Sequence, residues 1–217
     1  MEFQGSVIKS YAKKALSANY WPMVGFCLLY YVFVFAINYL SKIPTVGNGL
    51  YFIALVFVGP IISASFTLQL YWTYHSGEAP KVSHLFEGFK GHRYWHVIGG
   101  TWYMTLFIFL WSLLLFIPGI IKSIAYSMTP YILMDQPEIS ATDALKKSMA
   151  MTKGYKWDIF VFYLSFIGWL LLAGITFGIV GIFYVIPYYT LSLAGIYDFL
   201  KSNDTAASTA AEEEITE

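Results

Sequence analysis

The sequence predicts an all-α integral membrane protein with six transmembrane helices. Of its 217 residues, 58% are hydrophobic and 12% are charged, which is about half the charged share of an ordinary soluble domain. The hydrophobic residues gather in runs of about 20, the length that a helix needs to cross the hydrocarbon core of a bilayer. The basic residues lie mostly between these runs, as in the loops of membrane proteins.

The predicted membrane domain covers residues 1–201. Its first apolar run is too long for the core of a signal peptide, so we expect it to be a retained span. The six expected spans are 20–40, 50–74, 95–117, 119–135, 157–177 and 180–200. Residues 202–217 are small, polar and acidic, a composition that is typical of a disordered tail.

The lysine and arginine residues predict the orientation of these spans. They concentrate before the first span, in the two longer loops and after the sixth span, whereas Lys42 stands alone among the other connections. By the positive-inside rule, both termini and the two longer loops are then cytoplasmic. The other connections, near 42–48, at Pro118 and near Gly178, are short, so we expect three helical hairpins.

Each expected hairpin begins in a similar way, which predicts three copies of one unit. The motifs LSANYWPMV, FKGHRYWHV and TKGYKWDIF each place a small residue shortly before a tryptophan. Trp21, Trp95 and Trp157 are therefore expected to anchor the hairpins in the membrane interface. Amphipathic patterns near 6–17 and 140–152 predict helices along the inner membrane surface, where lysines would meet anionic head groups.

A proline lies in the second helix of each hairpin, in the motifs VGPIIS, IPGIIK and VIPYYT. Pro60, Pro118 and Pro187 would each start a helix, or kink one whose freed carbonyl group accepts a hydrogen bond from a neighbour. Pro118 with Gly119 marks the expected turn of the middle hairpin. The motif SATD from Ser140 is typical of a capping box.

Alignment of the three proline motifs places Ser63, Lys122 and Thr190 at equivalent positions. This alignment predicts a polar layer, or a contact site for an anion or a lipid, inside the membrane. A bare ammonium there costs about 2.5 kcal/mol or more on insertion scales. Lys122 could extend to the outer head groups, or it could face a cavity that holds an anionic lipid or solute, and the sequence leaves both open.

Three aspartates, Asp135, Asp158 and Asp198, are expected at the inner ends of spans, where exposure to water accounts for them without a function. Asp135 and Asp198 would lie at helix C-termini, the unfavourable end of the helix dipole for a carboxylate. Pairing with Lys146, Lys147 or Lys201 would offset that cost.

Several classes of site are not predicted. The four histidines lie in or beside one loop, but no acidic or cysteine ligand accompanies them at a known metal spacing, so their role stays open. They are His75, His84, His92 and His96. We expect no catalytic residue, cofactor or metal, and the zero net charge gives no nucleic-acid footprint.

From about Ile117 onward, the chain resembles the bacterial membrane-protein family called domain of unknown function 975, found mostly in Firmicutes. The resemblance rests on IPGIIK, SMTPYILMDQPEISATDALKKSMAMTKGYKW, LSFIGWLLL and the closing VIPYY with Tyr197. It implies a multi-pass protein of the bacterial plasma membrane and supplies no catalytic residues. The tryptophan-led hairpins are also distantly similar to the membrane domain of some glycerophosphodiester phosphodiesterases, which favours a lipid-related role.

Two functions are compatible with these features. The first is a non-catalytic accessory or lipid-interacting protein of the cell envelope, whose partners are anionic lipids, further copies of the chain or other membrane proteins. The alternative is a small transporter or channel for an anionic solute or lipid, with Lys122 in the pathway. A transporter should show more than one charged group at depth, so we favour the first.

Overall fold

Every regular element in the described part of the chain is a helix. The computed structural model describes residues 3–44, 47–89, 93–114 and 116–216. The elements are α1 (Gly5–Ala18), α2 (Tyr20–Leu40), α3 (Gly47–Phe57), α4 (Gly59–Ser76), the 3₁₀-helix η1 (Val82–Phe89), α5 (Arg93–Leu114), α6 (Phe116–Tyr126), α7 (Thr129–Asp135), α8 (Ala141–Met151), α9 (Lys156–Leu164), α10 (Ile167–Ile175), the π-helix η2 (Gly181–Val185) and α11 (Ile186–Thr216).

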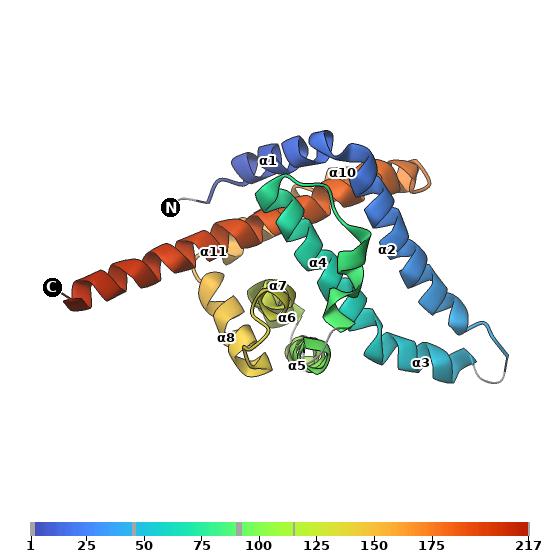
Figure 1. Cartoon of the computed structure of the whole chain (residues 1–217), viewed down its shortest axis with the longest axis horizontal. Coiled ribbons are helices and arrows are strands. Elements are labelled where there is room, and N and C mark those ends of the chain that lie inside the picture. The colour runs from blue at the N-terminus through green and yellow to red at the C-terminus, as the bar shows by residue number, and fades with distance from the viewer. Residues whose placement is uncertain (1–2, 45–46, 90–92, 115, 217) are drawn as a thin grey trace.

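The core forms where α4, α7 and α11 meet. Helix α11 packs against α4 and α1, and α7 packs against α4 and α5. Leu191, Ala194 and Ile196 of α11 are fully buried there, as is Ile132 of α7. In Figure 1, α1 lies along one side of this core, and α5 is seen end-on while α2, α4 and α11 run across the view. The long helices therefore do not run in one common direction.

Four helical segments are long and apolar enough to cross a membrane. They are Tyr20–Leu40, Gly47–Ser76, Arg93–Leu113 and Lys156–Ile175. Their apolar side chains point largely outward, and α10 buries no residue at all. Leu171 and Ile175 of α10 are 65% and 76% exposed, and Phe35 of α2 is 72% exposed. Exposed apolar surface of this extent suggests a membrane protein.

These four segments match the expected spans 20–40, 50–74, 95–117 and 157–177. The spans expected at 119–135 and 180–200 are not confirmed. The first is divided between α6 and α7, and α7 has 7 residues, most of them buried. Pro130 accounts for this break, because a proline removes a backbone N–H and clashes with the carbonyl four residues earlier, here that of Tyr126. The second begins in the short η2 and continues as the buried face of α11.

The three hairpins are present in part. Gly119 of α6 approaches α5 so closely that an added Cβ would lie 2.9 Å from the Cα of Ser112. Between α10 and η2 the chain reverses at Gly178, which has a φ of 83° and donates its N–H to Ala173 over 2.8 Å. This is the glycine-dependent helix ending expected at a tight turn. The equivalence of the three units is not confirmed.

Two of the predicted prolines lie at the starts of helices, and aromatic side chains donate the hydrogen bonds that the missing proline N–H groups cannot supply. Pro60 stands in the first turn of α4, and the carbonyl four residues before it, that of Val56, accepts the indole N–H of Trp102 over 3.0 Å. Pro187 similarly follows Phe183, whose carbonyl accepts the Tyr20 hydroxyl over 3.1 Å. Carbonyls freed by proline thus receive donors from other helices, as backbone groups in a membrane must.

Helices occupy both regions where surface helices are expected. Helix α1 covers 5–18 and α8 covers 141–151, while their position on a membrane surface stays a prediction. One lysine of α1 departs from the expected contact with head groups. The ammonium of Lys9 donates to the Ser165 hydroxyl and lies 4.9 and 4.7 Å from the ring centroids of Phe162 and Phe166. Burial lowers the pKa of Lys9.

Helix α11 extends into the C-terminal segment, for which a disordered tail stays a prediction. Helix α11 continues to Thr216, so the backbone of residues 202–216 is helical. Alanine and glutamate, which are frequent in this segment, have high helix propensity. The segment also extends a helix that is already formed, so it avoids the unfavourable nucleation step.

Ser140 caps α8 in a modified form of the expected capping box. Its hydroxyl oxygen accepts the Asp143 backbone N–H over 3.0 Å and its O–H donates to the Asp143 carboxylate over 2.7 Å. In the standard capping box the carboxylate would accept the backbone N–H of the cap residue instead. The hydrogen bond from Ser140 and the nearby Lys146 lower the pKa of Asp143.

This cap predicts an acid-sensitive start of α8. Because folding lowers the pKa of Asp143, the ionised carboxylate stabilises the folded protein above the ordinary carboxyl pKa of about 4. That stabilisation is lost as the pH falls through the lowered pKa of the folded state. Thermal unfolding in detergent between about pH 6 and 3 should show a smaller acid-dependent loss for Ser140→Ala than for wild type. Glu138→Gln, at an exposed neighbouring acid, is the control and should keep the wild-type slope.

Candidate functional site

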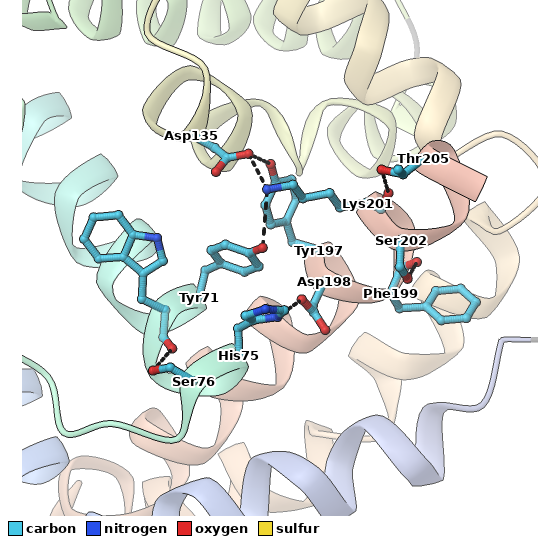
Figure 2. Close-up of polar contacts among 11 residues, drawn as sticks. Tyr71, His75, Ser76, Asp135, Tyr197, Asp198, Phe199, Lys201, Ser202 and Thr205 are labelled. Atoms are coloured by element: carbon cyan, nitrogen blue, oxygen red, sulfur yellow. Dashed lines mark hydrogen bonds and ion pairs between the residues drawn. The ribbon is translucent and has the colours of Figure 1, made fainter. Parts of the chain in front are cut away.

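Four polar side chains from three helices meet beside the core, and we call them the Asp135 cluster: Tyr71 of α4, Asp135 of α7, and Tyr197 and Lys201 of α11. Figure 2 shows Lys201 and Tyr197 both directed at the Asp135 carboxylate. The ammonium of Lys201 donates to Oδ2 of Asp135 over 2.7 Å, and the Tyr197 hydroxyl donates to the same oxygen over 3.0 Å. The ammonium also donates to the Tyr71 hydroxyl over 3.4 Å.

The aromatic rings enclose this ion pair. The Tyr197 ring stacks on Tyr131 at a centroid distance of 4.9 Å and meets Tyr71 edge-on at 5.0 Å. The Lys201 ammonium lies 5.3 Å from the centre of the Tyr71 ring. As a result the Asp135 side chain is 17% exposed and that of Lys201 37% exposed. Cation–π contact and the ion pair together stabilise a charge that is partly removed from water.

The local structure explains why Asp135 needs a cationic partner. It is the last residue of α7, where the helix dipole disfavours a negative charge. Burial alone would lower the pKa of Lys201, but its hydrogen bond to Asp135 and the charge of Asp135 outweigh burial and raise that pKa. Lys201 therefore stays protonated at neutral pH, and its stabilising contribution is lost only as the pH rises through the raised pKa.

The sequence predicted that Asp135 and Asp198 pair with lysines, and the structure shows the partner of each. Asp135 pairs with Lys201, one of three candidates. Asp198 instead accepts a hydrogen bond from Nδ1 of His75 over 2.7 Å, which extends the polar contacts of the cluster along α4 and α11 (Figure 2). Lys147 lies 3.8 Å from Asp204, and Lys146 lies 3.2 Å from Asp143.

The expected polar layer consists of residues with separate surroundings. The Lys122 ammonium lies 4.8 and 5.7 Å from the ring centres of Trp111 and Tyr126 and 3.8 Å from the sulfur of Met149 in α8. Ser63 is exposed and lines a groove of about 340 Å³ between α2, α4 and α5. Thr190 donates to the backbone carbonyl of Ile186 over 2.8 Å.

Within the part of the chain that the structure describes, no hydrogen bond or ion pair joins Lys122, Ser63 and Thr190 to one another. The aromatic and thioether contacts hold Lys122 against α5 and α8. Its two alternatives, extension to the outer head groups and a cavity for an anion, stay predictions.

The three tryptophans expected as interfacial anchors share one environment. Trp21, Trp95 and Trp157 each lie within the first three residues of a candidate span. Their exposed fractions are 72%, 64% and 71%, so all three indoles extend away from the core.

The histidines form no metal centre in the part of the chain that the structure describes. His92 lies outside the described residues. His84 contacts the side-chain oxygen of Gln69, and its other ring nitrogen lies 4.0 Å from Glu87. No group of three or more histidine, cysteine or acidic side chains that could hold an ion occurs among the described residues.

The motifs around the Asp135 cluster also carry a family match. Residues 112–204 match the family Protein of unknown function (DUF975). The match confirms the resemblance predicted from Ile117 onward. The DUF975 segment, residues 112–204, contains Asp135, Tyr197 and Lys201, while Tyr71 precedes it. Searches of curated proteins and of solved structures gave no match.

Sequence reasoning missed part of the candidate site. Nothing in the sequence indicated a polar role for Tyr71, because a tyrosine in an apolar run is usually a packing residue. Tyr197 drew attention only through the DUF975 resemblance. Trp102 and Tyr20 could have been sought as donors once a proline had been placed inside a helix, but nothing in the sequence pairs either with its carbonyl.

Proposed function

We propose that the protein is a non-catalytic membrane protein that binds anionic lipid head groups through exposed lysines near the starts of its candidate spans. The observation that carries this proposal is the common placement of Trp21, Trp95 and Trp157, each strongly exposed at the start of a candidate span. Indoles favour the head-group region of a bilayer, and lysines beside them attract anionic lipids.

The charged residues near these indoles support the proposal. Lys13 and Lys14 lie exposed on α1, shortly before Trp21, and Lys153 is exposed shortly before Trp157. By contrast, the Asp135 cluster satisfies its own charges, because Lys201 and Tyr197 both donate to Asp135. An ion pair with that geometry holds α4, α7 and α11 together and leaves the exposed lysines as the groups available to lipids.

The proposal is tested by thermal unfolding of the purified protein in mixed micelles. Added phosphatidylglycerol should raise the unfolding temperature more than added phosphatidylcholine, because a ligand that binds the folded state stabilises it. Salt should weaken the difference by screening exposed charges. Replacing Lys13 and Lys14 together by glutamine should reduce the response to phosphatidylglycerol.

Lys42→Gln is the matched control, because Lys42 is exposed on the side predicted to face outward. That variant should keep the full wild-type response. Equal shifts with the two lipids in the wild-type protein would contradict the proposal.

A further inference from the structure

An apolar groove runs between α6 and α9 and has a volume of about 480 Å³. One wall consists of Ile117, Ile120, Ile121 and Ile124, whose spacing of three and four residues places them on one face of α6. Ile117 and Ile124 are seven positions apart, so this face is about 10 Å long. All the groove-lining side chains of α6 are therefore hydrocarbon.

The other wall, on α9, is also apolar where it faces the groove, and one of its residues carries a charge at the end of its side chain. Its lining residues are Lys156, Trp157 and Phe160, and Lys156 is the sole charged group among the residues that line the groove. Lys156 is the first residue of the candidate span Lys156–Ile175, so this charged residue stands where an apolar helix begins. The acidic neighbour Asp158 lines a different groove, on the α1 side of Trp157.

The groove is open and apolar where a lipid would meet it. Ile117 and Ile121 are 71% and 45% exposed, and Trp157 is 71% exposed. Hydrocarbon beside a cation and an interfacial indole matches the two parts of a phospholipid, an acyl chain and a phosphate. A peptide or a soluble anion would use one of these features and leave the other without a partner.

We propose that this groove binds one phospholipid with an anionic head group, with an acyl chain along the isoleucine face of α6 and the phosphate at Lys156. The proposal rests on the lipid-binding function proposed above and assigns it a specific site. Charge complementarity selects the head group, because Lys156 has a positive charge and none of the described residues that line the groove is acidic.

The test uses a phosphatidylglycerol analogue with a photoreactive group on its acyl chain and the full-length protein in detergent. After irradiation, peptide mass spectrometry should find the label on residues 117–124 or 157–160. Lys156→Gln should reduce labelling about fivefold, the change expected for one lysine facing an anionic lipid, and Lys156→Arg should restore it. Ile121→Trp, which fills the groove, should also reduce labelling.

Two matched variants control for charge and for size. Lys153→Gln removes a neighbouring exposed lysine that does not line the groove, and Leu172→Trp adds an indole to the exposed surface of α10. Both should keep wild-type labelling. If Ile121→Trp fails to fold, Lys156→Gln and its arginine rescue still decide the outcome.

The failures of the two proposals can be told apart. Label spread evenly over the candidate spans, with a phosphatidylglycerol-dependent thermal shift intact in Lys156→Gln, would overturn this site and leave the general lipid proposal standing. Loss of the shift in wild type would overturn both. If Ile121→Trp instead converts an oligomer into a monomer, the groove holds a second copy of the chain, and the lipid site is wrong.

Discussion

Asp135→Ala should lower the stability of the folded protein by about 2 kcal/mol, because it leaves the Lys201 ammonium and the Tyr197 hydroxyl without their shared acceptor. Loss of one partner of a fully buried pair costs about 3–5 kcal/mol, and the 37% exposure of the Lys201 side chain reduces that figure. The effect should appear as a lower midpoint in thermal or denaturant unfolding in detergent.

A double-mutant cycle distinguishes this ion pair from simple loss of packing. Asp135→Asn combined with Lys201→Met should cost less than the sum of the two single changes, because the second change removes the charge that the first leaves unpaired. Lys146→Met is the control for a surface pair, since Lys146 and Asp143 are 67% and 58% exposed, and it should leave the unfolding midpoint nearly unchanged. Additive effects in the cycle would show that the cluster is not energetically coupled.

Trp102→Phe should destabilise the protein by about 1–3 kcal/mol, because the Val56 carbonyl then loses its donor. That carbonyl depends on Trp102 because Pro60, four residues later, has no N–H to offer. Adding Pro60→Ala should recover part of the loss, since the alanine N–H can donate to Val56. The measurement is the unfolding midpoint of the single and double variants in the same detergent.

The pairing of Trp102 with Pro60 makes this prediction specific. Trp169→Phe is the control, because the described contacts of Trp169 are ring contacts with Tyr184 and Tyr188. In that background, Pro60→Ala should give no recovery. If Pro60→Ala changes stability equally with and without Trp102, the hydrogen bond does not compensate for the proline.

Much of the local structure follows from the sequence. The span expected at 20–40 coincides with α2, because a continuous apolar run of that length satisfies its backbone groups only as a helix in a membrane. Ser140 caps α8 and Gly178 ends a helix turn, since each acts through backbone groups within a few residues. Short-range interactions of this kind require no knowledge of the remaining chain.

The candidate site was predicted less completely. The sequence indicated that Asp135 needs a cation but left three lysines as possible partners, and it assigned no role to Tyr71. Hydrophobicity also gave 119–135 and 180–200 the same status as the other spans. An apolar run has the same composition whether it meets lipid or the interior of the protein, so hydropathy by itself cannot separate the two.

The sequence by itself determined the helical class, the local caps and turns, and six apolar segments of membrane-spanning length, four of which match candidate spans in the structure. Only the tertiary structure decided that α7 and residues 187–200 of α11 are largely buried, and that Lys201 is the partner of Asp135. It alone also decided that Trp102 and Tyr20 donate to carbonyls freed by prolines. The physical reason is distance along the chain. Helix propensity and capping act between near neighbours, whereas burial and hydrogen-bond partners depend on which distant helices pack together.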